Sequence, residues 1–97
     1  MVRYHIIADG RVQGVGFRFF CIMNAQNYDL TGWVRNMDNG MVEIEVQGEI
    51  DSIKKFLEII KNGNRFIKVD ELYQKKIEVI YNEYSFTERY EMLKIQK

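Results

Sequence analysis

The sequence contains no proline, one cysteine and one histidine. Without proline, folding involves no slow prolyl isomerisation. The single cysteine, Cys21, cannot form an internal disulfide, so we expect a cytoplasmic protein. The single histidine, His5, lies in a predicted strand with no second histidine to join it, which argues against a metal site. We therefore expect no metal and no other cofactor.

The sequence also lacks a net charge and long apolar runs. Fourteen basic residues balance fourteen acidic ones, so no overall field attracts nucleic acid or an anionic membrane. No apolar run approaches the roughly 18 residues of a membrane span, and the N-terminus lacks the long apolar core of a signal peptide. We expect no nucleic-acid and no membrane partner. With 46% apolar residues, the 97 residues should fold as a single monomeric domain, 1–97.

Hydrophobic periodicity predicts the order β-α-β-β-α-β. Alternation predicts strands at 2–8, 30–36, 41–47 and 76–81, with Asp38-Asn39-Gly40 as a hairpin turn. Helical spacing predicts one helix from about residue 17, with Cys21 in the core, and a second helix that follows Asp51 as N-cap and ends at Asn62-Gly63. This order is that of the split-βαβ, ferredoxin-like α+β sandwich, in which both helices cover one face of an antiparallel sheet.

The last residues allow two interpretations. SFTE at 85–88 matches a capping box and favours a helix, whereas residues 89–95 are equally compatible with a closing strand.

The stretch GRVQGVGFR, residues 10–18, joins the first strand to the first helix. Glycine costs a regular element up to about 1 kcal/mol relative to alanine, so this run needs a reason. A glycine-rich turn before a helix can direct successive backbone N–H groups toward one anion, and Arg18 adds a planar cation suited to two oxygens. A plain turn, with Arg18 in a surface ion pair, is an equal alternative on this pattern alone.

Better-known phosphate motifs do not fit this stretch. It has no lysine for a P-loop, and Phe19 stands where the dinucleotide fingerprint requires its third glycine. A cysteine-dependent phosphatase loop would need a cysteine at position 12, where Val12 stands. Covalent phosphotransfer by Cys21 is therefore not expected.

Two segments together resemble the acylphosphatase family. Its pattern runs G-x-V-Q-G-V-x-F-R and then G-W-V-R-N-x-x-x-G-x-V-E-x-x-x-x-G. The chain matches the first part at 10–18 and the second through Gly32, Trp33, Val34, Arg35, Asn36, Gly40, Val42, Glu43 and Gly48. The likeness covers about residues 3–72. The family commonly closes with a strand of the form F-x-I-x-Y, for which Tyr90–Lys94 is the best candidate here.

The resemblance implies a metal-independent enzyme that hydrolyses acyl phosphates to a carboxylate and inorganic phosphate. By that likeness, the backbone amides of 13–18 and the Arg18 guanidinium hold the phosphoryl group; the residues are Gln13, Gly14, Val15, Gly16, Phe17 and Arg18. The Asn36 side chain would position the attacking water, and the substrate's own phosphate oxygen would take the proton. A carboxylate leaving group, with a conjugate-acid pKa of about 4, needs no general acid.

A non-enzymatic RNA-binding module is the alternative. It shares the ferredoxin-like order, and GVGFRFF faintly resembles an aromatic RNA-binding strand motif. Those aromatics must lie on a strand to stack on bases, whereas Phe17, Phe19 and Phe20 enter a predicted helix. A neutral chain also lacks the counterion release that drives nucleic-acid binding.

Overall fold

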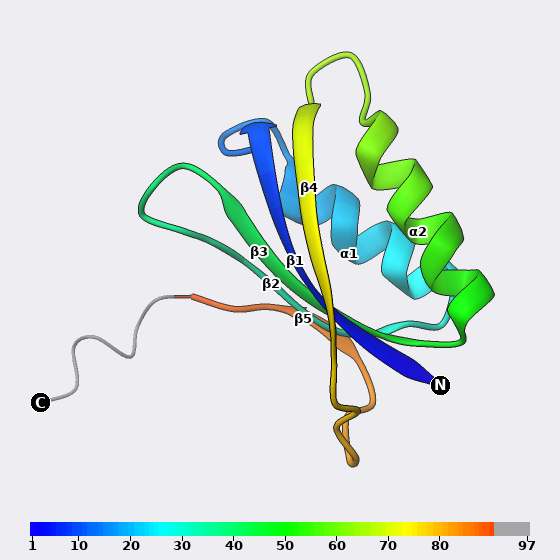
Figure 1. Cartoon of the computed structure of the whole chain (residues 1–97). Coiled ribbons are helices and arrows are strands. Elements are labelled where there is room, and N and C mark those ends of the chain that lie inside the picture. The colour runs from blue at the N-terminus through cyan, green and yellow to red at the C-terminus, as the bar shows by residue number, and fades with distance from the viewer. Residues whose placement is uncertain (91–97) are drawn as a thin grey trace, which may run out of the picture.

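The structure is a computed structural model that describes residues 1–90 (Figure 1). Its elements are β1 (Val2–Arg11), α1 (Phe17–Asn27), β2 (Thr31–Asn36), β3 (Val42–Gly48), α2 (Ile50–Asn62), β4 (Lys68–Ile77) and β5 (Phe86–Glu88). The strands form one sheet in the order β4-β1-β3-β2-β5, and both helices pack on the same face (Figure 1). The predicted ferredoxin-like α+β fold is confirmed, with a short parallel fifth strand beside β2.

The core lies between the sheet and the two helices. Alternation along β3 points Val42, Ile44 and Val46 inward, and all three are fully buried, as the sequence predicts. Cys21 lies in the same core on α1, where burial raises the pKa of its thiol well above the ordinary range. A buried thiol of raised pKa is a poor nucleophile, so Cys21 is a packing residue.

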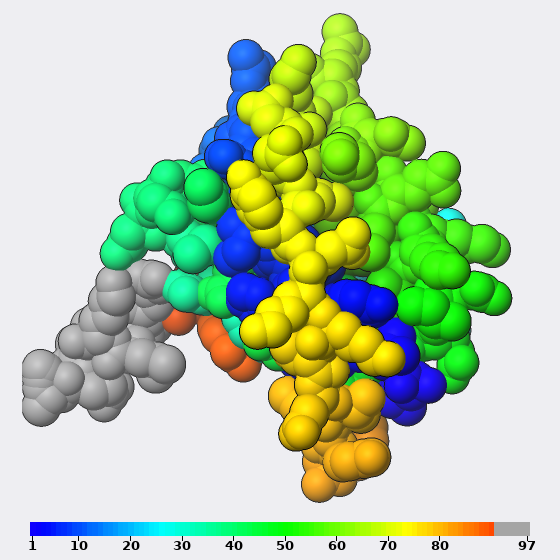
Figure 2. Space-filling view, viewed as in Figure 1, coloured from blue at the N-terminus to red at the C-terminus, as the bar shows by residue number. Residues whose placement is uncertain are grey.

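The predicted strand at 76–81 is wrong in position. β4 runs from Lys68 to Ile77, and it ends where Ile77 pairs with Arg3, near the start of β1. The alternation rule fails because β4 is an edge strand with most of its side chains exposed, and Figure 2 shows it uncovered along the front of the molecule. Because Val69 is the only buried residue of β4, the segment carries little hydrophobic periodicity.

One predicted cap is also wrong. α2 begins at Ile50 with Glu49 as its N-cap. Asp51 lies in the first turn, where its negative charge interacts favourably with the positive end of the helix dipole. The predicted end of this helix at Asn62-Gly63 is correct.

The capping box at 85–88 does not start a helix. Its residues form β5, because Phe86 packs into the core against Phe56, with ring centroids 6.2 Å apart. The Arg89 N–H donates to the Val34 carbonyl at 2.8 Å, which continues the pairing with β2. The closing strand proposed at Tyr90–Lys94 extends into residues 91–97, outside the described residues.

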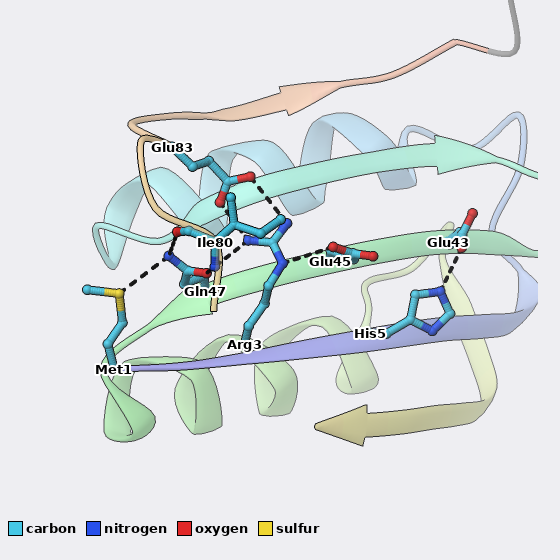
Figure 3. Close-up of polar contacts among 8 residues, drawn as sticks. All are labelled: Met1, Arg3, His5, Glu43, Glu45, Gln47, Ile80 and Glu83. Carbon is cyan, nitrogen blue, oxygen red and sulfur yellow. Dashed lines mark hydrogen bonds and ion pairs between the residues drawn. The ribbon is translucent and has the colours of Figure 1, made fainter. Parts of the chain in front are cut away.

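The segment 78–85 connects β4 and β5, which lie at opposite edges of the sheet. It is held by Arg3, whose buried guanidinium donates to Glu83 at 2.7 Å, Glu45 at 2.9 Å and Gln47 at 3.1 Å (Figure 3). Gln47 in turn exchanges two 2.8 Å hydrogen bonds with the backbone of Ile80 (Figure 3). These contacts lie on the sheet face that the helices leave open, and they fix the crossing that places β5 beside β2.

This cluster predicts a stability that depends on pH. Burial alone would raise the pKa of Glu83, but hydrogen bonds from Arg3 and Thr31 outweigh it and lower the pKa. A carboxyl with a lowered native pKa stabilises the fold above its unfolded pKa, about 4.3, and this contribution is lost as the pH falls through the native pKa. We expect Glu83→Gln to cost about 1–3 kcal/mol at pH 7 and progressively less as the pH falls through the native pKa of Glu83.

Urea unfolding of both proteins from pH 7 to pH 3 measures this difference. Glu71→Gln, which removes an exposed carboxylate from β4, is the matched control and should leave the pH dependence unchanged. A Glu83→Gln protein whose stability falls with pH as steeply as that of the wild type would contradict the assignment.

Candidate active site

The turn between β1 and α1 depends on glycine at two positions. Gly14 and Gly16 have φ angles of +75° and +83°, which side chains with a Cβ rarely adopt. A Cβ built on either residue would meet nothing within 4 Å. The backbone conformation therefore requires glycine, and the space above the turn is open to a guest.

The N-terminus of α1 adds positive potential to this turn. The helix begins at Phe17, its N-cap is Gly16, and neither a capping side chain nor an acidic residue in the first turn pairs with its amides. Unpaired N–H groups and the positive end of the helix dipole both favour an anion.

Arg18, the second residue of α1, lies where two neighbouring hollows meet, and its side chain is 34% exposed. The larger hollow, of about 420 Å³, is lined among the described residues by Gln13, Arg18, Asn36, Met37, Asp38, Arg89 and Tyr90. We call it the Asn36 hollow. The smaller, of about 260 Å³, is lined by Val12, Gly14, Gly16, Phe17, Arg18, Phe19, Ile22 and Glu88. We call it the Phe19 hollow.

Asn36 is the last residue of β2. Its Oδ1 atom is buried and has no hydrogen-bond partner within residues 1–90. An unpaired buried acceptor costs roughly 1–3 kcal/mol, so this oxygen is suited to accept a hydrogen bond from a water molecule.

Gln13 connects the glycine turn to the hairpin that carries Asn36. Its Nε2 atom donates to the backbone carbonyls of Met37 and Met41, each at 2.8 Å. The sequence predicts a role only for the backbone amide of Gln13 and does not reveal this role of its side chain. The contact fixes the distance between the turn and Asn36, which come from separate parts of the chain.

Glu88 on β5 is a second residue that the sequence analysis missed. Its Oε2 atom forms an ion pair with Nη1 of Arg18. With β5 at Phe86–Glu88, Phe86 and Tyr90 match the aromatic ends of the F-x-I-x-Y pattern, and Glu88 stands at its isoleucine position. Aligning the F-x-I-x-Y pattern with residues 86–90 therefore places a carboxylate where the family has an apolar residue.

The predicted site residues divide between the two hollows. Gln13, Arg18 and Asn36 line the Asn36 hollow, and Gly14, Gly16 and Phe17 line the Phe19 hollow with Arg18. The Val15 side chain packs against the core, and it is absent from the described lining of either hollow. The Phe17 ring is also buried, so any part that these two residues play in anion binding belongs to their backbone amides.

His5 lies within β1 and contacts a carboxylate on β3. Its Nε2 lies 2.6 Å from Glu43, whose other oxygen accepts from Arg35 at 2.6 Å. Burial alone would raise the pKa of Glu43, but these two partners outweigh it and lower the pKa.

The described residues contain no group of three or more metal-ligating side chains, and no helix among them is long and apolar enough to cross a membrane.

Comparisons with known proteins show the family of this chain. A family model described as Acylphosphatase matches residues 4–88. A curated acylphosphatase of Clostridium acetobutylicum is 50% identical over 86 residues, which cover 89% of this chain and 94% of the relative. One from Bacillus licheniformis is 54% identical over 72 residues, covering 74% and 80% respectively. The crystal structure of acylphosphatase from Bacillus subtilis matches with a TM-score of 0.88 and 42% identity, covering 93% of this chain and 100% of that chain.

Proposed function

The chain belongs to the acylphosphatase family, an enzyme family that hydrolyses acyl phosphates to a carboxylate and inorganic phosphate, and we propose how its residues perform this reaction. The proposal rests on one observation above all: Gln13, Arg18 and Asn36, from separate elements, line one hollow. The hollow therefore brings together Arg18, which can bind phosphate, Asn36, which can hold water, and Gln13, which connects their two elements.

In the proposed site, the phosphoryl group lies over the glycine turn. The amides of residues 13–18 and the Arg18 guanidinium donate to its oxygens. The open space above Gly14 and Gly16 and the uncapped start of α1 support this placement. Phosphoryl transfer concentrates charge on these oxygens, so preorganised donors supply most of the stabilisation that the transition state needs.

Asn36 holds the attacking water. Its unpaired Oδ1 accepts a hydrogen bond from the water and directs a lone pair of the water oxygen toward phosphorus. As a neutral amide, it adds no negative charge beside the phosphate. The water oxygen bonds to phosphorus, the bond to the carboxylate oxygen breaks with its electron pair, and a phosphate oxygen takes the proton of the water.

The test is hydrolysis of benzoyl phosphate, followed by absorbance in the presence of a chelator. We expect the wild-type protein to turn over with the chelator present, because the proposed site holds the phosphoryl group with amides and a guanidinium alone. Turnover that stops on chelation and returns with added Mg²⁺ would contradict the proposal.

We also propose that residues 1–97 act as one monomeric, cytoplasmic domain that binds no nucleic acid. The balanced charge supports the lack of nucleic-acid binding, and a single cysteine without an internal disulfide supports the cytoplasmic location. The aromatic residues of the rival RNA-binding motif lie on α1, where Phe17 is buried, so they form no stacking surface on a strand.

The Arg18–Glu88 ion pair gives a prediction for phosphate affinity. In the free enzyme, Glu88 competes for the guanidinium that binds phosphate, and it places a like charge beside the dianion. We expect Glu88→Gln to lower the inhibition constant of inorganic phosphate about tenfold. Glu88→Asp, which keeps the charge, is the matched control and should stay near the wild-type value. An unchanged or higher inhibition constant in Glu88→Gln would contradict this role.

A further inference from the structure

The Phe19 hollow is only partly used by the proposed mechanism. Its glycine backbone and Arg18 serve the phosphoryl group, but Phe19 and Ile22 have no part in it. Phe19 lies in the first turn of α1 with its side chain 67% exposed, although large aromatic side chains are usually buried. Ile22 lies one turn further along, so the two side chains share one helix face.

The stereochemistry of phosphoryl transfer indicates which group would lie against Phe19 and Ile22. The attacking and leaving oxygens lie roughly in line on opposite sides of phosphorus. Asn36 lines one hollow and is absent from the described lining of the other, and Arg18 lies where the two meet. A water on Asn36 therefore directs the leaving acyl group away from the Asn36 hollow and toward the Phe19 hollow.

The Phe19 hollow has the size and chemistry for an uncharged acyl group. Its volume is about 260 Å³, of which the phosphoryl group on the glycine turn takes a part; for comparison, an apolar cavity of roughly 150 Å³ suffices to bind benzene. Phe19 and Ile22 offer apolar surface, and an aromatic ring gains further from offset or edge contacts with Phe19. Glu88 adds a negative charge to the same lining, which disfavours an acyl group that carries its own carboxylate.

We propose that the Phe19 hollow is an acyl subsite that selects uncharged, apolar acyl groups, such as an aromatic acid, over small or anionic ones. This inference rests on the proposed function, because the phosphoryl group must first lie on the glycine turn and Arg18. Phe19 and Glu88 are then specificity-determining residues for the reaction of the family.

The experiment compares kcat/KM for benzoyl phosphate and acetyl phosphate. Because both substrates carry the same phosphoryl group, their ratio cancels effects on phosphate binding. We expect Phe19→Ala to lower the benzoyl-to-acetyl ratio about tenfold, mainly through the KM of benzoyl phosphate, and to leave the inhibition constant of phosphate unchanged. Met23→Ala is the matched control: Met23 is 44% exposed on the same helix, outside the described lining of this hollow, and the ratio should not change.

A second experiment tests whether Glu88 disfavours anionic acyl groups. The acyl group of succinyl phosphate carries a free carboxylate, which acetyl phosphate lacks, so Glu88→Gln should raise the kcat/KM of succinyl phosphate relative to acetyl phosphate about fivefold. An unchanged succinyl-to-acetyl ratio would overturn the role of Glu88 in acyl selection. A Phe19→Ala enzyme with the wild-type benzoyl-to-acetyl ratio, or with equal losses on both substrates, would overturn the apolar subsite.

Failure of the proposed function looks different from failure of the subsite. If Arg18 did not hold the phosphoryl group, an Arg18 variant would retain activity on both substrates, whatever the ratios in Phe19→Ala. If only the subsite assignment is wrong, Arg18 remains essential, and Phe19→Ala leaves the benzoyl-to-acetyl ratio of kcat/KM unchanged.

Discussion

Arg18→Ala is expected to abolish hydrolysis, with kcat/KM reduced by about 10³-fold or more, and to abolish measurable phosphate binding. Arg18 is the cation that lies where both hollows meet, beside the uncapped start of α1. Without it, the proposed site loses the only guanidinium that we assign to the phosphoryl oxygens, and their charge is stabilised far less. Steady-state kinetics and calorimetric titration with phosphate measure the two losses.

The fold should tolerate this change. The Arg18 side chain is 34% exposed, and an exposed ion pair such as that with Glu88 contributes at most about 1 kcal/mol. Urea unfolding of Arg18→Ala should therefore stay close to wild type, which separates a lost site from a lost structure.

Arg18→Lys tests the shape of the cation and not only its charge. A guanidinium offers two parallel N–H donors to two oxygens, whereas an ammonium is a point charge on a flexible stem. We expect the lysine enzyme to recover little of the lost rate. Near-normal turnover by Arg18→Lys would mean that charge alone suffices, and the bidentate role of Arg18 would be wrong.

Asn36→Ala is expected to lower kcat at least about 10²-fold and to change phosphate affinity little. Its buried, unpaired Oδ1 is the group that we assign to the attacking water, and water is not part of phosphate binding. Because the alanine removes a buried acceptor that no described residue pairs with, stability should not fall by the amount that a broken hydrogen bond costs.

Asn36→Asp sharpens this prediction. A carboxylate accepts a hydrogen bond from water as well as the amide does, but it adds a negative charge beside the phosphate. We expect this variant to raise KM and the inhibition constant of phosphate as well as lowering kcat. A surviving kcat in Asn36→Ala, with a sharply raised KM, would make Asn36 a binding residue and overturn its assigned role.

The sequence predicts the fold best where burial is one-sided. β3 alternates cleanly because Val42 and Ile44 face the helices and Glu43 faces the open side. β4 was misplaced because an edge strand buries too little to show a period. The sequence leaves helix and strand open at β5, because its three residues are held by the core packing of Phe86 and by long-range pairing with β2, which a local capping pattern does not contain.

The candidate site could be predicted for its motif residues and not for their partners. Gly14 and Gly16 indicate the turn in the sequence, because their positive φ angles favour glycine. The contacts of Gln13 with the hairpin and of Glu88 with Arg18 join residues far apart in the chain, so only the folded topology brings them together. Arg3 shows the same limit, since its guanidinium is buried and its partner Glu83 lies in a connection with no regular structure (Figure 3).

The central claim is that water attacks phosphorus, and the fate of the oxygen tests it most directly. Benzoyl phosphate is hydrolysed by the wild-type enzyme in ¹⁸O-labelled water, and both products are examined by mass spectrometry. Attack at phosphorus by the Asn36-held water predicts one ¹⁸O in the phosphate and none in the benzoate. Label in the benzoate would show attack at the carbonyl carbon and would contradict the assigned roles of the glycine turn, Arg18 and Asn36.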